Sequence, residues 1–178
     1  ALPISVETVF VFIHGSQRNA DDYFCAGMSV VAPFVGDSSN RSDEDDADAD
    51  NGFEQSDKVL VIAPKFVADV DEDDRDRIPN VLYWAEEADD AHLLSHSWRY
   101  GADALNGNHT DQKNSKSGGI SSFAVIDALL EYLIAGRPED DDGPYYFPRL
   151  KRIVVGGHSA GGQVVHRWAL LSSSPIIW

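Results

Sequence analysis

The sequence predicts an α/β fold with a mostly parallel sheet flanked by helices. Three short runs rich in β-branched and other apolar residues predict buried strands, at 9–13 (VFVFI), 58–65 (KVLVIAPK) and 153–155 (IVV). Stretches with helical periodicity separate these runs and follow the last of them. Strands that alternate with helices in this way form parallel sheets with helices on both faces. The 178 residues suit a single domain, 1–178, with enough apolar content for a sizeable core.

The first predicted strand ends in the sequence His14-Gly15-Ser16-Gln17, and a helix is expected soon after it. Asn19 is a typical N-cap residue, and acidic residues follow in the first turn, where they suit the helix dipole. The pattern predicts that this helix continues to about Val31. Its expected inward face consists of Tyr23, Phe24, Met28 and Val31.

Two acidic stretches, at about 37–58 and 69–77, lack apolar periodicity and predict solvated loop insertions. Within the first stretch, Asp46, Asp48 and Asp50 approximate the alternate spacing of oxygen ligands in a calcium loop. The following glycine falls one place late for an EF-hand, and the last candidate ligand is Asp57 where that motif has Glu. The sequence therefore predicts no metal site and no cofactor, with calcium at Asp46, Asp48 and Asp50 as the alternative.

The long connection at 81–105 carries several large aromatic residues. It is expected near the carboxyl edge of the sheet, so these side chains either line a substrate cleft or pack the connection onto the core. Both interpretations remain open for Tyr83, Trp84, Trp98 and Tyr100.

A largely apolar helix is expected after the serine pair Ser121-Ser122, which can cap it, and before Gly136 and Pro138, which end it. Asp127 lies on its narrow polar stripe. We therefore expect Asp127 to bond to solvent or to a neighbouring loop, and not to act as a catalytic acid.

The third predicted strand runs into Gly157-His158-Ser159-Ala160-Gly161, and an amphipathic helix to about Leu171 follows. A serine on so sharp a turn between a strand and a helix is expected to adopt strained backbone angles. The flanking glycines pass so close to neighbouring backbone that a Cβ would clash. The N–H of Ala160 and the positive end of the helix then lie beside any oxyanion formed at Ser159.

This segment resembles the nucleophile elbow of the α/β-hydrolase superfamily, in the GHSAGG form common among esterases and lipase-like enzymes. The resemblance implies that Ser159 is the nucleophile and that Gly157 and Gly161 are the elbow glycines. In that family, a backbone N–H just beyond the HG motif and the N–H after the nucleophile form the oxyanion hole. These donors would be Ser16, with Gln17 as the near alternative, and Ala160. By the same resemblance, His14 braces its loop and is not the catalytic base.

The resemblance covers the central part of such a hydrolase, because the triad order is Ser, then Asp or Glu, then His, and the chain reaches only Trp178. His158 and His166 are poorly placed to activate Ser159, the first by the sharpness of the turn and the second by the direction of helical side chains. We expect the acid and the histidine outside this chain. We also expect the chain to associate with a missing C-terminal hydrolase segment or a second chain.

Charge and composition bound the partners and the location. The net charge of −16 and the pI near 4.5 argue against nucleic-acid binding. No apolar run is long enough for a transmembrane segment. Two glycosylation acceptor patterns begin at Asn40 and Asn108 and favour an extracellular, secreted glycoprotein. Cys25 is the only cysteine of the chain, so no disulfide closes within it.

Two hypotheses of function follow. The first is a serine hydrolase of the carboxylesterase or lipase-like kind, which cleaves a small-molecule or lipid-like ester through an acyl-enzyme on Ser159. The alternative is a non-catalytic α/β-hydrolase-fold protein that serves as a binding or structural module.

Overall fold

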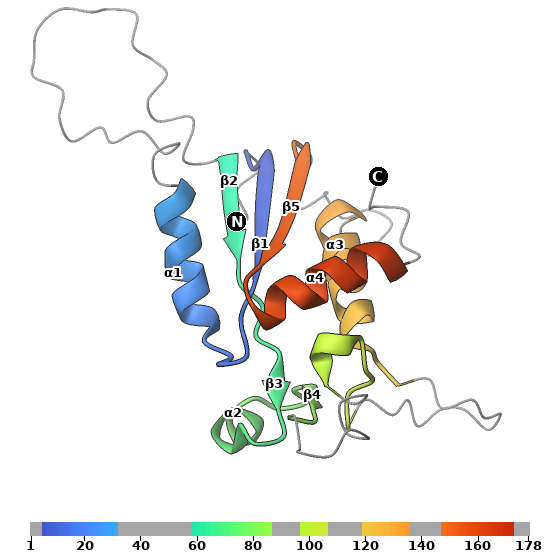
Figure 1. Cartoon of the computed structure of the whole chain (residues 1–178). Coiled ribbons are helices and arrows are strands. Elements are labelled where there is room, and N and C mark those ends of the chain that lie inside the picture. Colours follow the sequence, from blue (N-terminus) through green and yellow to red (C-terminus); the bar gives the residue numbers. More distant parts are fainter. Residues whose placement is uncertain (1–4, 32–57, 87–96, 107–118, 136–146, 173–178) are drawn as a thin grey trace, which may run out of the picture.

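The main sheet has three parallel strands. The computed structural model describes residues 5–31, 58–86, 97–106, 119–135 and 147–172 (Figure 1). The strands are β1 (Thr8–Ile13), β2 (Val59–Ile62) and β5 (Arg152–Gly157), in the order β2-β1-β5. Thr8 pairs with Val59 on one side and with Arg152 on the other. This parallel arrangement confirms the predicted α/β class.

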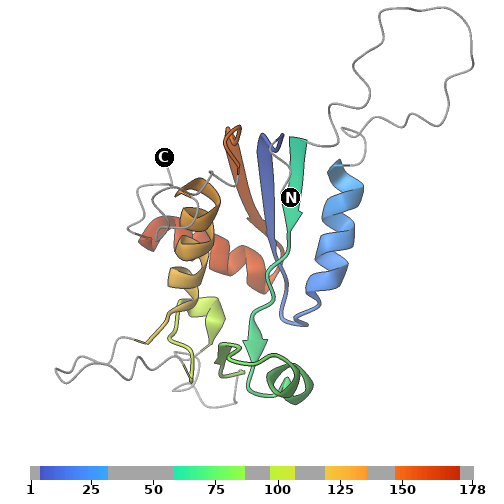
Figure 2. The same cartoon turned by 180° about the vertical axis from the view of Figure 1, so that it is seen from behind.

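Seven further elements complete the described part. The longer helices are α1 (Ala20–Val31), α3 (Ser122–Ala135) and α4 (Ala160–Leu171). A second, two-stranded parallel sheet consists of β3 (Val67–Ala68) and β4 (Tyr83–Trp84). The short helices α2 (Glu72–Arg77) and η5 (Trp98–Tyr100) follow β3 and β4, respectively. Figure 1 and the reverse view in Figure 2 show that β3, α2 and β4 lie beyond the carboxyl ends of the main strands.

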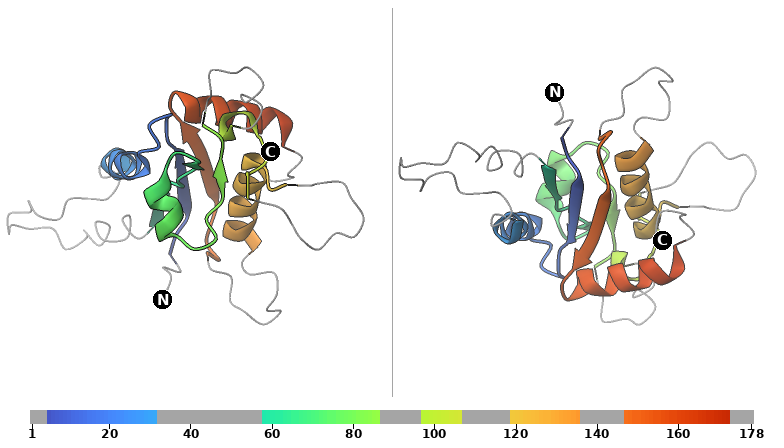
Figure 3. Two further views of the ribbon diagram at one scale, coloured as in Figure 1. Left: turned by 90° about the horizontal axis from the view of Figure 1, so that it is seen from below. Right: turned by 90° about the horizontal axis from the view of Figure 1, so that it is seen from above.

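The alternation of side chains along β1 produces the layers of the fold. Val9, Val11 and Ile13 are completely buried and belong to one apolar core with residues of α3 and α4. Phe12 points to the opposite face, where a Cβ on Gly27 of α1 would lie 2.6 Å from its ring. The end-on views in Figure 3 show the same division, with α1 on one side of the sheet and α3 and α4 on the other.

The boundaries predicted for α1 are confirmed, but part of its predicted inward face is wrong. Phe24 and Met28 are each 44% exposed, whereas Gly27 and Val31 are buried. Gly27 brings the helix against the ring of Phe12. Because this close approach fixes the rotation of the helix, Phe24 and Met28 turn away from the sheet.

The second acidic stretch is more structured than the solvated loop that we expected. It contains α2, and its Asp71 accepts hydrogen bonds from the backbone N–H of Ala68 and the side chain of Arg18. Acidic composition alone does not reveal such partners, because the cation comes from a distant part of the chain.

Asp127 of α3 and the two tryptophans of the aromatic connection serve packing, whereas Tyr100 is exposed. Asp127 Oδ1 accepts hydrogen bonds from Trp168 Nε1 at 2.8 Å and Ser172 Oγ at 2.7 Å, so it joins α3 to α4. We expected Asp127 to bond to solvent or to a loop, whereas it bonds to a neighbouring helix and the C-cap of that helix. Trp84 and Trp98 are each only 2% exposed and belong to the core.

Some predictions lie outside the described residues. These are the first acidic stretch up to residue 57 with Asp46, Asp48 and Asp50, and the glycosylation patterns at Asn40 and Asn108. Among the helices described, none has the length and apolar character needed to cross a membrane.

Candidate functional site

The two predicted site segments meet at the carboxyl edge of the main sheet. From β1 the chain continues to α1 on one face, and from the neighbouring β5 it continues to α4 on the other (Figures 1 and 3). In open α/β sheets, such a reversal between adjacent strands opens a crevice in which ligands bind. A Cβ built on Gly15, after β1, would lie 3.6 Å from Ser159 Cβ, after β5. The fold therefore brings the two segments together.

Ser159 has the strained backbone that its position predicts. Its φ is 55° and its ψ is −121°, a combination that residues with a Cβ rarely adopt. Serine at a helix N-cap usually accepts a hydrogen bond from the first turn. The Ser159 side chain occupies the N-cap of α4, makes no such bond and is exposed. Its hydroxyl is thus presented to solvent at the helix end instead of serving as a cap.

The glycines of the Ser159 turn (Gly157–Gly161) are sterically required. A Cβ on Gly161 would lie 2.1 Å from the carbonyl oxygen of Ile13, and one on Gly157 would lie 2.5 Å from Gly161 C. These are backbone atoms, which cannot rotate away as a side chain can. The predicted clash is therefore confirmed at both positions.

The peptide between Ser159 and Ala160 directs a donor out of α4. The Ser159 carbonyl accepts a hydrogen bond from Gln163 N–H at 3.1 Å, along the helix. In a trans peptide the N–H points opposite to the carbonyl, so the N–H of Ala160 points out of the helix N-terminus. Within the described part of the chain, this N–H has no acceptor.

The His14 loop (His14–Arg18) holds the second predicted donor in a similar way. The Gly15 carbonyl accepts hydrogen bonds from His14 Nδ1 at 2.8 Å and from Arg18 N–H at 3.1 Å. By the same peptide geometry, the N–H of Ser16 points away from these two bonds. No acceptor for it occurs among the described residues.

His14 is a structural residue with a fixed tautomer. Its Nε2 accepts the backbone N–H of Phe66 at 2.8 Å, and because an amide N–H can only donate, Nε2 carries no proton. The proton is therefore on Nδ1, which donates to Gly15. Burial lowers the pKa of His14 below its ordinary value, and Trp98 packs edge-on against the ring at 4.9 Å between centroids. The expected bracing role is confirmed.

Arg18 is a further part of this loop that sequence reasoning missed. Its Nε lies 2.6 Å from Asp71 Oδ2, and its Nη1 lies 2.8 Å from Glu86 Oε1 and 2.9 Å from the Ser16 carbonyl. Burial opposes the charged form, but the hydrogen bonds that Arg18 donates to Asp71 and Glu86 raise the pKa of Arg18 overall. Burial likewise favours the neutral form of Asp71, but the Ala68 N–H and Arg18 lower the pKa of its carboxyl.

Other side chains near Ser159 are held by neighbours. The hydroxyl of Tyr23 lies 3.1 Å from His158 Nδ1, which links α1 to the Ser159 turn. His166 is exposed on α4. In the part of the chain that the structure describes, no histidine nitrogen hydrogen-bonds the Ser159 hydroxyl. The same part contains no cluster of three or more His, Cys, Asp or Glu side chains that could hold a metal ion.

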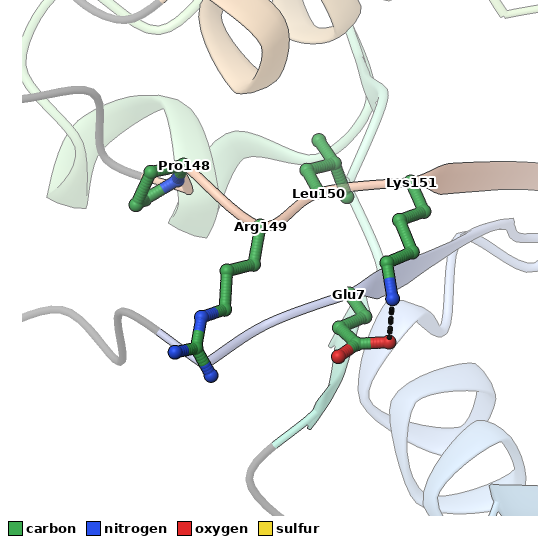
Figure 4. A pocket seen from close by; sticks show the side chains of 5 residues that line it. All are labelled: Glu7, Pro148, Arg149, Leu150 and Lys151. Atoms are coloured by element: carbon green, nitrogen blue, oxygen red, sulfur yellow. Dashed lines mark hydrogen bonds and ion pairs between the residues drawn. The ribbon is translucent and has the colours of Figure 1, made fainter.

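A cavity of about 410 Å³ lies far from these groups, at the amino ends of β1 and β5. Glu7, Arg149 and Lys151 contribute its charged lining, and Lys151 Nζ lies 2.8 Å from Glu7 Oε2 (Figure 4). Its side chains are exposed or half-buried and open to water. The cavity is therefore separate from the site at Ser159.

Comparison of the chain with models of protein families, with curated proteins and with solved structures finds no match.

Proposed function

We propose that this chain carries the nucleophile and the oxyanion hole of a serine hydrolase of the α/β-hydrolase type. The observation that carries this proposal is the state of Ser159, which combines strained backbone angles with an exposed hydroxyl that does not cap its own helix. An ordinary glycine-rich turn needs neither feature. Strain of this kind costs about 1–3 kcal/mol and persists where the surrounding structure imposes it, often at active sites.

The proposed reaction is the cleavage of an ester through an acyl-enzyme. Ser159 Oγ attacks the carbonyl carbon, and its proton passes to a histidine that lies outside this chain. The tetrahedral oxyanion forms hydrogen bonds with the N–H groups of Ala160 and Ser16. As it collapses, the bond to the leaving alkoxy oxygen breaks, and that oxygen takes the proton from the histidine and departs as the alcohol. Water then repeats the attack on the acyl-enzyme, which releases the acid and restores the serine. The reaction requires no cofactor.

The wider proposal follows from the family resemblance of the Ser159 turn and the His14 loop. The enzyme is a secreted carboxylesterase or lipase-like hydrolase that acts on a small-molecule or lipid-like ester. Its catalytic acid and histidine come from a further hydrolase segment or a second chain that associates with this one.

Labelling with a fluorophosphonate probe tests the proposed nucleophile. We expect the full-length wild-type protein to be labelled stoichiometrically and Ser159→Ala to remain unlabelled. Ser172→Ala is the matched control, because it removes a serine hydroxyl bonded to Asp127, away from the Ser159 turn. Peptide mapping of the adduct locates the modified serine. A folded wild-type protein that does not react, or an adduct on another residue, contradicts the proposal.

A second candidate function is that of a non-catalytic binding or structural module with the same fold. The observation that favours it is that, among the described residues, no histidine nitrogen hydrogen-bonds Ser159. A full-length protein that folds cooperatively, resists the probe and hydrolyses no ester supports this function.

A further inference from the structure

We propose that Arg18 is a positioning residue, which fixes the His14 loop so that the N–H of Ser16 remains aimed at the oxyanion. This inference rests on the proposed function. It adds a residue that acts through Ser16, without contact with the substrate, and that ties the loop to the second sheet.

The backbone of Arg18 indicates that its side chain is needed. Its φ of 56° lies in the left-handed region, where glycine is the least strained residue. An arginine at such a position keeps its strain only if its contacts offset it. The side chain is 14% exposed and makes polar contacts with Asp71, Glu86 and the Ser16 carbonyl.

Both acidic residues that bind Arg18 are tied to the second sheet, Asp71 through its carboxylate and Glu86 through its backbone. Asp71 Oδ2 also accepts the N–H of Ala68, the last residue of β3, at 2.9 Å. The N–H of Glu86, two residues after β4, donates to Asp69 Oδ1 at 2.8 Å. The planar guanidinium therefore joins the His14 loop to two residues whose positions the second sheet sets.

Arg18 holds two successive carbonyls of the His14 loop at once. Its backbone N–H binds the Gly15 carbonyl, and its Nη1 binds the Ser16 carbonyl. These bonds fix the planes of the peptides on both sides of Ser16. An oxyanion donor is effective only when it is held at hydrogen-bond distance from the charge that develops. Loss of the guanidinium is therefore expected to weaken transition-state binding more than substrate binding.

Steady-state hydrolysis of a chromogenic ester by the full-length protein tests this role, with Arg18→Met as the principal variant. Removal of one oxyanion donor costs about 100- to 1,000-fold in kcat. Misplacement of a donor should cost less, so we expect kcat to fall by about 10- to 100-fold. KM is expected to stay within about threefold, since the lost interaction forms mainly in the transition state. Arg18→Lys should recover part of kcat through its single ammonium group.

Arg149→Met is the matched control, because Arg149 is exposed at the opposite end of the sheet (Figure 4). It should leave kcat and KM unchanged. If Arg18→Met does not fold, Arg18→Gly removes the same guanidinium while it suits a φ of 56°. Glu86→Gln weakens the brace at a more exposed side chain and should lower kcat by a few fold.

The outcomes separate this inference from the proposed function. An active wild type with a folded Arg18→Met or Arg18→Gly variant of unchanged kcat overturns the positioning role alone. A raised KM with unchanged kcat also overturns it, because that result assigns Arg18 to substrate binding. A folded wild-type protein without esterase activity and without reaction at Ser159 overturns the proposed function, and this inference with it.

Discussion

The two ends of the main sheet solve different physical problems. At the amino ends, Glu7, Arg149 and Lys151 line an open cavity. Lys151 and Glu7 form an ion pair there that is exposed to water. At the carboxyl ends, the chain accepts unfavourable backbone angles at Ser159 and Arg18. An open cavity distinguishes the first end, and strained backbone angles distinguish the second. The comparison favours the second as the chemical site, because strain needs a compensating use and an open cavity does not.

The carboxyl end is also the more constrained of the two. Ile13 and His14 leave no space for a Cβ on Gly161, and the ring of His14 is bonded at both nitrogens. Exposed charges at the amino end remain in contact with water, which screens their attraction and leaves little net gain. Substitutions at the two ends should therefore differ in their effects on stability.

The largest effect on the free energy of unfolding is expected for Gly161→Ala, at the carboxyl end of the sheet. Its Cβ would lie 2.1 Å from the Ile13 carbonyl oxygen, so β1 and α4 must move apart. We expect the free energy of unfolding to fall by about 3 kcal/mol or more, because the clash is with backbone atoms, which can be relieved only by moving a whole strand or helix. Chemical denaturation followed by circular dichroism measures this change.

Gly156→Ala is the control for that substitution. Gly156 lies in β5, and the nearest atom to its added Cβ would be 3.9 Å away, on the ring of Phe12. This is an ordinary contact, so the unfolding free energy should change by less than about 1 kcal/mol. Equal effects of the two substitutions would contradict the steric account of the Ser159 turn.

A smaller effect of opposite sign is expected for Ser159→Gly. Glycine accepts a φ of 55° with a ψ of −121°, so the substitution relieves the strain at the turn. Glycine also gains entropy in the unfolded chain, and we therefore expect a net stabilisation of only about 1 kcal/mol. Ser159→Ala keeps the Cβ and should bring no such gain, although both variants lose the nucleophile. Thermal unfolding of both variants tests this, and a lower melting temperature for Ser159→Gly would argue against stored strain.

Much of the fold was predictable because its signals are local. The apolar runs give β1, β2 and β5, and the N-cap of α3 is visible as Ser121, whose Oγ accepts the N–H of Ala124. The geometry of the Ser159 turn was also predictable, because every part that causes its strain is local. The strand β5, the helix α4 and the glycines Gly157 and Gly161 all lie within a few residues of Ser159 in the sequence.

The rest depends on contacts between distant segments. Arg18 carries no sequence signal, because its acceptors Asp71 and Glu86 lie 53 and 68 residues away. The orientation of α1 depends on the approach of Gly27 to Phe12, which periodicity does not encode. A prediction from periodicity considers only the spacing of apolar residues, and it therefore placed Phe24 and Met28 on the inward face, although both are exposed.

The smallest expected difference between the two ends is the pH range in which each loses stability in acid. Burial holds the pKa of His14 below its ordinary value of 6.5, and the nearby charges of Arg18 and Lys65 lower it further. The hydrogen bond to Gly15 and the charge of Asp71 act in the opposite direction without reversing the shift. Below pH 6.5, the unfolded chain therefore binds a proton at His14 that the folded protein does not. The contribution of His14 to the unfolding free energy is complete above pH 6.5 and declines as the pH falls towards its lower folded pKa.

The amino end responds in a lower pH window. The hydrogen bond from Lys151 lowers the pKa of Glu7 below its ordinary value of 4.5, so its contribution is lost only as the pH falls below 4.5. His14→Gln keeps an acceptor for the Phe66 N–H and should flatten the stability profile between pH 6.5 and 4.5. Lys151→Met should change only the part below pH 4.5, and by less, because the Glu7–Lys151 pair is screened by water. Denaturant midpoints between pH 3 and 8 measure both profiles. A His14→Gln profile parallel to that of the wild type would show that the imidazole does not couple protonation to folding, and the bracing role of its neutral form would then fail.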